Sequence, residues 1–281
     1  MFERLRSRVF WGVFFIVCFF ALLIFFWWEE YTTMRVVFLN VGQGDAFLLS
    51  FGSEQILIDS GRSGKELLHR LSRHMPFWDR TIEAVIATHP DADHIGGFPA
   101  LFRAYKVERV FTTGAVGDSE TALLFQEEIV RATGRQPDVL FRGGELSFPE
   151  QGKLFIRYPI TPLPPDTKDT NAGSLVARFV YGKTSFLFTG DLPREETVLA
   201  DEESVTVLKA AHHGSRYSTS DAFLEQVLPK ETIISVGKNS YGHPAEEVLE
   251  RLRVRQITIR RTDRDGDIVY VCALDSCSVR E

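Results

Sequence analysis

The sequence predicts an α/β domain, a layered sandwich with its functional site on one rim, that follows a single apolar N-terminal helix. Residues 9–28 carry no charged side chain, whereas charged residues recur throughout the rest of the chain. Beyond this segment, short β-prone stretches alternate with helical ones, a pattern typical of sheets covered by helices. Several apolar strands end in motifs rich in histidine, aspartate and glycine, and strand ends that carry such motifs favour a site on one rim.

The apolar segment, VFWGVFFIVCFFALLIFFWW, is long enough to cross a membrane, because about 20 residues of helix span the hydrocarbon core. Three arginines precede it and two glutamates follow it. Since positive flanks stay inside, we expect residues 1–8 to be a cytoplasmic basic flank and residues 9–28 a single-pass anchor in the cell membrane. Residues 31–281 would then form one extracytoplasmic domain.

Three other interpretations of the segment are less favoured. A cleaved signal peptide usually has a shorter apolar core that ends in small residues, and this segment ends in Trp27 and Trp28. Cys18 lacks the small neighbours of a lipoprotein cleavage site. A buried core helix would carry polar residues on one face, and this segment has none.

Residues 35–281 contain no low-complexity tract, fixed repeat or obvious linker, so one domain is the simplest organisation. Alternating and apolar runs bounded by turn residues predict strands at 35–41, 46–50, 55–59, 82–88, 154–158, 175–181, 185–189, 205–210, 232–236, 256–260 and 268–272. Amphipathic stretches predict helices at 65–73, 119–132, 194–200, 221–226 and 246–251.

The charge distribution argues against unaided binding of nucleic acid. Residues 1–28 carry three arginines and one glutamate, a net of +2, which leaves −8 for the remainder of a chain whose total is −6. An acidic domain repels phosphate backbones.

Cys272 and Cys277 lie in two short β-prone stretches around Leu-Asp-Ser. A disulfide across this hairpin would suit an oxidising exterior. Two unpaired strand thiols are equally compatible with the sequence.

Five of the seven histidines fall in three glycine-rich spots, and the first spot, THPDADHIGG, directly follows an apolar strand. His89 and Asp91 are two residues apart, so an extended backbone points them the same way, and Pro90 favours that backbone. Asp93 and His94 follow the turn and can face a second centre. Four potential ligands in six residues indicate a metal site far more strongly than a solvated acidic loop.

Further candidates follow two other apolar strands and one loop. Asp191 ends the strand SFLFTG, although a lone aspartate there could equally form a turn or cap a helix. His212 and His213 follow the strand VTVLKA, and His243 lies in the loop sequence YGHP. The remaining two histidines, in LLHRLSRHM, are expected to be exposed helix residues.

These motifs carry a family resemblance. HPDADHIGG, FLFTGD and LKAAHHGS resemble the metallo-β-lactamase-fold hydrolases. FLNVGQGDA, ILIDSG, NAGSLV, IISVGKNSYGHP and RTDRDGDI look more narrowly like the carboxy-terminal hydrolase domain of the ComEC family of competence DNA-uptake proteins. The ordered matches extend from residue 35 to residue 271. The resemblance implies an αββα sandwich that holds one or two divalent metal ions at the sheet rim.

The resemblance also implies a set of metal ligands. His89 and Asp91 would serve one ion, Asp93 and His94 the other, with Asp191 bridging. One of the two adjacent histidines would complete the second centre; the sequence leaves the choice open, with a slight preference for His212 over His213.

Two positions depart from the wider fold. Many relatives have histidine at the position of Asp91, and another histidine ligand where this chain has NAGS, residues Asn171 to Ser174. ComEC-like domains share the absence of this second histidine. The first site is therefore rich in oxygen ligands, so Mn²⁺ fits it as well as Zn²⁺, and occupancy by a single ion is also open.

Supporting roles fall to residues around these ligands. Asp59 is a candidate to accept the free N–H of a ligating imidazole. Asp45 is a second candidate, with a turn-forming role equally open, and Lys209 could supply positive charge or only pack. Asn171 and Ser174 would lie beside the first ion.

The candidate catalytic residues are Asp93, His213 and His243. Either histidine could contact a phosphate or protonate the leaving oxygen. The sequence thus predicts a membrane-anchored, metal-dependent hydrolase that acts through a metal-bound hydroxide, most plausibly a phosphodiesterase or nuclease. Hydrolysis of another envelope ester, amide or phosphodiester, or a non-catalytic metal-binding scaffold, are the alternatives.

The expected partners follow from the same interpretation. The apolar helix would attach the chain to the membrane, and nucleic acid or another phosphodiester would be the substrate. ComEC proteins join this domain to a large multi-spanning region, whereas this chain has one predicted span, so a role in transport would require a separate membrane channel. The sequence makes no prediction of oligomeric state.

Overall fold

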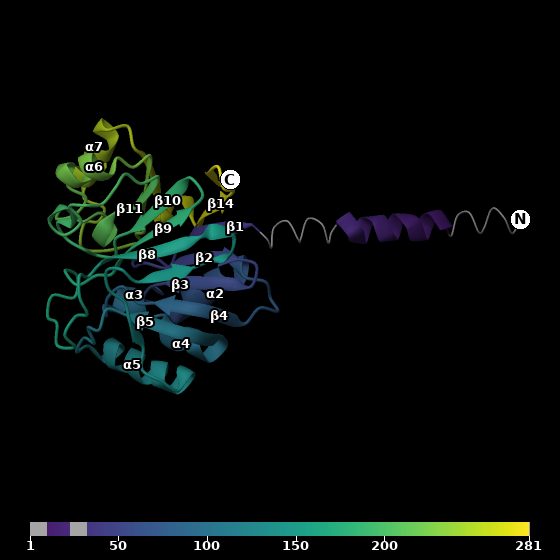
Figure 1. Ribbon diagram of the computed structural model, residues 1–281, viewed down its shortest axis with the longest axis horizontal. Helices are drawn as coiled ribbons and strands as arrows, with labels where there is room; N and C mark the ends of the chain where they lie inside the picture. The colour runs from purple at the N-terminus through teal and green to yellow at the C-terminus, as the bar shows by residue number, and fades with distance from the viewer. Residues whose placement is uncertain (1–9, 23–32, 281) are drawn as a thin grey trace, which may run out of the picture.

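The computed structural model describes residues 10–22 and 33–280 (Figure 1). Residues 10–22 form a helix that lies apart from the rest of the described chain. Among the described residues, no helix combines the length and apolarity needed to cross a membrane. The predicted basic flank and residues 9 and 23–28 of the predicted span lie outside the described residues.

Two sheets form the centre of the molecule. The first has eight strands in the order β15-β14-β1-β2-β3-β4-β5-β6. Its strands are β1 (Met34–Phe38), β2 (Phe47–Phe51), β3 (Glu54–Ile58), β4 (Thr81–Ile86), β5 (Lys106–Thr112), β6 (Asp138–Val139), β14 (Ile268–Cys272) and β15 (Cys277–Val279). Strands β3 to β6 are parallel, and the others pair antiparallel.

The second sheet has seven strands in the order β13-β12-β11-β10-β9-β8-β7. Its strands are β7 (Glu145–Ser147), β8 (Lys153–Tyr158), β9 (Val176–Tyr181), β10 (Thr184–Phe188), β11 (Val207–Lys209), β12 (Glu231–Ile234) and β13 (Thr258–Arg261). Because β10 to β13 are parallel, the segments that follow them emerge at the same end of the sheet.

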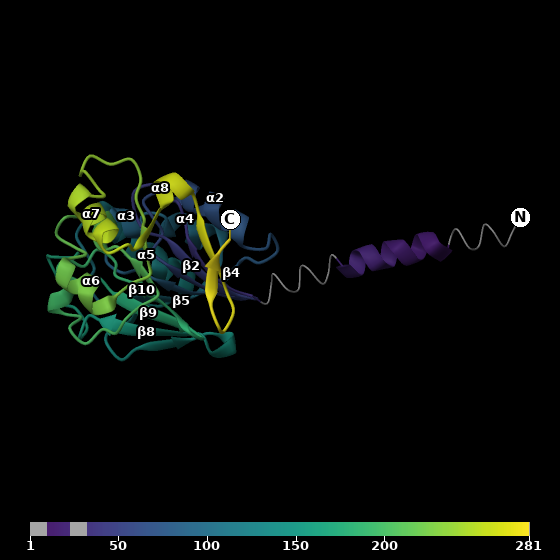
Figure 2. The same ribbon diagram turned by 90° about the horizontal axis from the view of Figure 1, so that it is seen from above.

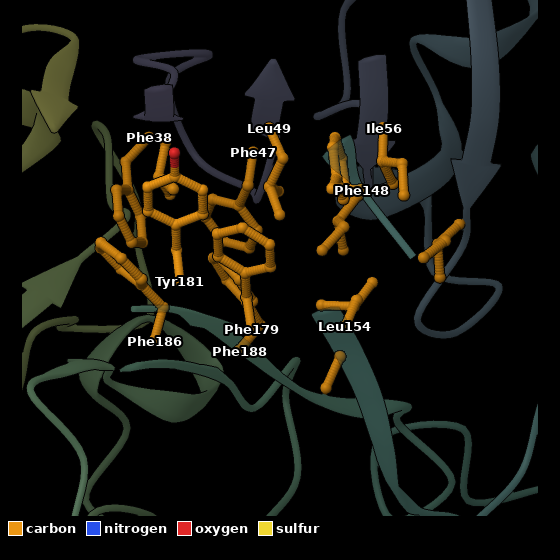
Figure 3. Packing of buried hydrophobic residues seen from close by; sticks show 14 of the residues in the cluster. Phe38, Phe47, Leu49, Ile56, Phe148, Leu154, Phe179, Tyr181, Phe186 and Phe188 are labelled. Atoms are coloured by element: carbon orange, nitrogen blue, oxygen red, sulfur yellow. The ribbon is translucent and has the colours of Figure 1, made fainter. Parts of the chain in front are cut away.

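The two sheets face each other across an aromatic core (Figure 3). Phe38 and Phe47 come from the first sheet and stack with Phe188 of the second at ring-centroid distances of 5.7 and 5.1 Å. All three are essentially inaccessible to solvent. Burying one such ring contributes about 1.5–3 kcal/mol, so this interface is a major source of stability.

Helices cover both outer faces of the sandwich, as the two views in Figures 1 and 2 show. The first sheet is covered by α2 (Gly64–His74), α3 (Ala92–Ile95), α4 (Phe98–Ala104) and α5 (Glu120–Thr133). The second is covered by α6 (Asp221–Val227) and α7 (Glu246–Val254), and α8 (Thr262–Asp265) follows β13. Short 3₁₀ turns lie at Pro149–Gln151, Glu195–Thr197 and Ala211–Gly214. The four layers are the αββα arrangement that the family resemblance implies.

One predicted helix is wrong. The stretch 194–200 forms only the 3₁₀ turn Glu195–Thr197, because Arg194 has a left-handed backbone (φ +51°) and Val198 leaves helical geometry. Strands β5, β6 and β7 and the one-turn helices α3 and α8 were not predicted.

Cys272 and Cys277 form a disulfide that links β14 to β15. Of the two possibilities that the sequence leaves open, a disulfide or two unpaired thiols, the structure shows the disulfide.

The strand registers fix where the motifs gather. Met34 at the start of β1 lies beside Phe51, the end of β2, and Thr81 starts β4 at this same end of the sheet. The opposite ends, after Phe38, before Phe47 and after Ile86, form the rim that carries the predicted ligands. The site and the entry of the chain into the first sheet thus lie at opposite ends of the strands.

Candidate metal centre

The segment after β4 delivers four of the predicted ligands. His89 lies in the turn beyond the strand, Asp91 is the N-cap of α3 with an extended backbone, and Asp93 and His94 lie on that short helix. His89 and His94 are buried, and their ring centroids are 4.0 Å apart. The local sequence thus places two imidazoles side by side at the rim.

The second sheet delivers Asp191 through a tight turn after β10. Gly190 has φ +52°, and a Cβ there would lie 2.8 Å from that of Ser174, so the turn requires glycine. The backbone N–H of Asp191 donates to the Ser174 hydroxyl over 3.0 Å. The Asp191 carboxylate is 3% exposed and faces the imidazoles of the first sheet.

The two adjacent histidines after β11 occupy different environments. His212 and His213 both have left-handed backbones, with φ +49° and +54°. His213 is 1% exposed, and its Nδ1 donates to the Ser235 carbonyl over 2.9 Å, since a carbonyl can only accept. This contact leaves Nε2 of His213 deprotonated and directed toward the centre in the neutral imidazole. The side chain of His212 is 30% exposed.

The imidazole nitrogens converge on Asp191. Nε2 of His94 and of His213 lie 3.3 and 3.4 Å from its Oδ2, and Nε2 of His212 lies 3.7 Å from the same atom. Nε2 of His213 also lies 3.6 Å from Oδ2 of Asp93. The donors form compact groups with their ligand atoms within 4.8 Å of one another, among them His89–His94–Asp191 and Asp93–His94–His213.

Three buried Nε2 atoms, those of His89, His94 and His213, have no hydrogen-bond partner among the described residues. A buried polar atom without a partner is costly, and such atoms are rare in native proteins. Nitrogen and carboxylate donors at this spacing match the ligands of divalent metal ions. The residues present therefore fit such an ion.

Asp59 orients one of these imidazoles. Its Oδ2 accepts from Nδ1 of His94 over 2.8 Å, and its two oxygens also accept from the backbone N–H and the hydroxyl of Thr88 at 2.8 and 2.7 Å. The carboxylate thereby fixes the His94 tautomer that presents Nε2 to the centre. The contact with His94 is the one that the predicted supporting role of Asp59 requires, and the role itself stays a prediction.

Asp45 and Lys209 form a fully buried ion pair behind the centre. Nζ of Lys209 also donates to the Gly190 carbonyl at 2.6 Å and lies 3.4 Å from Oδ1 of Asp191. Oδ1 of Asp45 lies 3.4 Å from Nδ1 of His213. Lys209 thus holds the turn that carries Asp191 and supplies charge beside it, while Asp45 lies next to a ligand candidate rather than at the surface.

The donors around Asp91 are richer in oxygen. Oδ2 of Asp91 lies 3.8 Å from Nε2 of His89, and its Oδ1 accepts from the Thr170 hydroxyl at 2.7 Å. Nδ1 of His89 lies 3.3 Å from the Ser174 hydroxyl. Oδ1 of Asn171 is buried with no hydrogen-bond partner among the described residues. The segment that lacks the extra histidine therefore supplies amide and hydroxyl groups to this side of the site.

Charge coupling within the cluster sets its proton content. Burial lowers the pKa of His94, but Asp191 and Asp59 raise it to a net value well above the usual one. His213 shows the same balance, with Asp191 and Asp45 raising its pKa. Burial raises the pKa of Asp191, yet His213 and His94 hold it well below its usual range. In the metal-free protein these imidazoles carry the positive charge, so metal binding must release protons.

The pKa values of His89, His212 and His243 are lowered, in contrast to those of His94 and His213. Burial, together with His94, holds the pKa of His89 well below its usual value. Burial and the neighbouring His212 and His213 lower the pKa of His243 to about 4. The rings of His212 and His243 are 5.3 Å apart. These two side chains border the centre on its solvent side.

The structure brings the predicted site residues together at one rim, with Asn171, Ser174 and Asp91 on one side and His243 on the other. It places His213, rather than His212, in the buried donor groups. Three contacts of the site, made by Thr88, Thr170 and Ser235, were not predicted. The position of Thr88 next to His89 in the motif is a sequence signal for such a contact. The Ser235 carbonyl and Thr170 carry no recognisable sequence signal.

Comparison with known proteins gives related sequences and folds. Residues 39–238 match the family model described as "Metallo-beta-lactamase superfamily". The chain is 33% identical to ComE operon protein 3 of Bacillus subtilis over 84% of this chain and 33% of that protein. It is 27% identical to competence protein ComA of Neisseria gonorrhoeae over 92% of this chain and 35% of that protein. The chain thus spans about a third of the length of these relatives.

A solved structure supports the same fold. The metallo-beta-lactamase fold protein YhfI of Bacillus subtilis superposes with a TM-score of 0.60 at 14% identity, over 85% of this chain and all of that one. The family match implies divalent metal binding, and the His/Asp donor groups described above could hold such an ion. The family model, the competence-protein relatives and the αββα fold agree, and the chain belongs to the metallo-beta-lactamase superfamily.

Proposed function

We propose that this chain is a membrane-anchored, metal-dependent phosphodiesterase of the nuclease type whose domain faces the outside of the cell membrane. The observation that carries the hydrolase assignment is the set of three buried Nε2 atoms, those of His89, His94 and His213, which have no hydrogen-bond partner among the described residues and belong to donor groups with Asp191 and Asp93. The phosphodiester class rests on the similarity to competence proteins.

The proposed ligand sets follow the donor groups. His89 and Asp191, which share a donor group with His94, would hold one ion together with Asp91, which lies outside the compact groups with its Oδ2 3.8 Å from Nε2 of His89. Asp93, His94 and His213 would hold the other, with Asp191 close to both. We therefore propose His213 as the ligand in place of His212, because its Nε2 is buried and its Nδ1 is committed to a carbonyl.

Divalent ions at this rim would act as Lewis acids toward a phosphoryl oxygen and lower the pKa of water to near neutrality. Zn²⁺ and Mn²⁺ both suit the mixture of nitrogen and oxygen donors. No serine or cysteine nucleophile is required for such chemistry.

The chain's own residues would orient substrate and ligands. His212 and His243 border the solvent side, and both have a lowered pKa, caused first by burial. As neutral imidazoles they can donate one N–H each to a phosphoryl oxygen. Asp59 and Lys209 would keep His94 and Asp191 in place during turnover.

The membrane attachment rests on the uncharged segment 9–28, with its arginine flank. The similarity to competence proteins favours the same environment. A role in the movement of nucleic acid would require a separate membrane channel as partner, because the chain matches only a third of those relatives.

Hydrolysis by the full chain in detergent tests the proposal. With Mn²⁺ or Zn²⁺, it should cleave bis(p-nitrophenyl) phosphate and single-stranded oligonucleotides. Asp191→Ala and His94→Ala should abolish turnover and bound metal, whereas Lys230→Ala, an exposed position before β12, should change neither. Turnover that survives both site substitutions would refute the proposal, and bound metal without hydrolysis of any phosphodiester would favour a scaffold.

A further inference from the structure

We propose that a cationic, aromatic surface beside the metal centre binds the strand that flanks the scissile phosphodiester in single-stranded nucleic acid. The surface, called here the strand surface, consists of Arg194, Arg216, Tyr217, Lys238 and Tyr241. The inference rests on the proposed function and adds to it the residues that bind the polymer and the direction in which it leaves the centre.

Backbone contacts bring these segments together. The N–H of Arg194 donates to the Tyr217 carbonyl over 3.2 Å, which places the turn after Asp191 against the loop that follows His213. The N–H of Ala245 donates to the Gly214 carbonyl over 2.9 Å. Gly214 also packs so tightly on Pro244 that a Cβ at this glycine would lie 2.7 Å from that of the proline. The loops at 215–217 and 238–243 are therefore neighbours.

A row of rings connects the strand surface to the metal centre. The ring of Tyr241 lies 5.8 Å from that of His243, which lies 5.3 Å from that of His212. Nε2 of His212 is 3.7 Å from Oδ2 of Asp191. A polymer with one phosphodiester at the centre would therefore pass directly over these side chains.

The cations of the strand surface are available to a ligand. Arg194, Arg216 and Lys238 are exposed, and none forms an ion pair with a residue in the described part of the chain. By contrast, most other arginines and lysines of the domain are paired with carboxylates. In a region whose formal charge is −8, three unpaired cations beside the candidate site form a local exception to the acidic surface.

The cavity beside Asp91 is lined by more carboxylates than cations and is therefore unfavourable for phosphate. Its volume is about 430 Å³, and its lining includes Asp118, Asp166 and Lys168. Three carboxylates, of Asp91, Asp118 and Asp166, line the cavity with this one lysine. The lysine lies 3.4 Å from Asp118, which partly neutralises its charge. A polyanion is thus directed away from this cavity and over the strand surface.

The tyrosines indicate unpaired bases. Tyr217 and Tyr241 are 71% and 67% exposed. Surfaces that combine cations with exposed aromatic rings bind single strands by contacting the backbone and stacking on the bases. A duplex hides its base faces, so it cannot use the rings. The structure therefore favours a single strand over a duplex.

Binding of a phosphorothioate dT12 labelled with fluorescein tests this surface, with anisotropy as the measurement and the full chain in detergent with Mn²⁺ as the protein. The test variants are Arg216→Ala/Lys238→Ala and Tyr241→Leu. The charge-matched control is Arg135→Ala/Lys230→Ala, at two exposed positions beyond α5 and before β12, away from the rim. A labelled duplex and an RNA of the same length complete the set.

The double variant should weaken binding at least tenfold and reduce the slope of log K against log salt by about 1.4, since each phosphate contact to a single strand contributes about 0.7. Tyr241→Leu should weaken binding on the order of tenfold with little change in slope. The control should leave both quantities unchanged.

Equal losses in the test and control double variants, or equal affinity for duplex and single strand, would overturn the proposal. Because anisotropy needs no turnover, this result is independent of the hydrolysis of bis(p-nitrophenyl) phosphate, which tests the proposed function by itself.

Discussion

Nδ1 of His94 donates to a buried carboxylate oxygen of Asp59 over 2.8 Å, and neither side chain has any contact with solvent. The same carboxylate accepts from the N–H and the hydroxyl of Thr88. Asp59 therefore ties the imidazole to the end of β4 and sets the nitrogen that faces Asp191. The orientation of His94 is built into the metal-free protein.

Asp59→Asn should lower metal affinity about 10–100-fold while preserving the fold, the usual effect of removing a partner of a ligating histidine. The amide keeps the volume of the side chain. Its NH₂ group, however, must face either His94 or Thr88, which donate hydrogen bonds to the carboxylate in the wild type. Competition with a chromophoric chelator measures the affinity. Wild-type affinity in this variant would show that the contact has no orienting role.

His213→Ala should reduce metal affinity by more than Asp59→Asn does, because His213 belongs to the buried donor groups. His212→Ala should retain the metal and lose turnover, since its partly exposed ring borders the solvent side. Metal content after dialysis, measured beside the rate of diester hydrolysis, separates the two roles. Metal loss confined to His212→Ala would restore the assignment that the sequence favours.

Lys209→Met should destabilise the metal-free protein by about 3–5 kcal/mol, because it leaves Asp45 and Asp191 buried without their common cation. Added Mn²⁺ should recover part of this loss by supplying positive charge beside Asp191. Urea denaturation in EDTA and in Mn²⁺ gives both values. Lys230→Met, at an exposed lysine, is the control and should cost little.

Glu195 predicts a specific pH dependence of stability. Burial raises the pKa of its carboxyl from 4.5 to about 7, although both oxygens accept the N–H of Thr219. The folded state therefore holds a proton that the unfolded state releases, so stability should fall as pH rises from about 4.5 to about 7. At 1.36 kcal/mol per pH unit this amounts to about 3 kcal/mol.

Glu195→Gln should remove this component of the slope, which thermal melts in EDTA at pH 5, 6, 7 and 8 would measure as a difference from the wild type. Glu196→Gln, next to it in the chain, should keep the wild-type slope. Parallel pH profiles for the wild type and Glu195→Gln would contradict the interpretation.

Periodicity and turn residues predict most of the strands to within about two residues, because the buried strands of both sheets are apolar and bounded by glycine. The same signals miss β5, where Lys106, Glu108 and Arg109 alternate with valines on a strand whose outer positions are exposed. They also miss β7, which is only three residues long. Local sequence carries little information about elements that tertiary contacts define.

The site shows the same division. The motif THPDADH identifies four donors because four ligand-type side chains lie within six residues directly after a buried strand. It cannot separate His212 from His213, since both have a left-handed backbone and strand alternation does not apply there. The Ser235 carbonyl that distinguishes them lies 22 residues away along the chain.

The donor groups draw on both sheets. His89, Asp93 and His94 follow β4 of the first, and Asp191 and His213 follow β10 and β11 of the second. An ion held between them would cross-link the two sheets at the rim. It would add about 2.7 kcal/mol to the free energy of unfolding when the free metal concentration exceeds the dissociation constant 100-fold. Resistance to a protease would then report how much metal the surroundings supply, and a metal-starved cell would lose the protein as well as its activity.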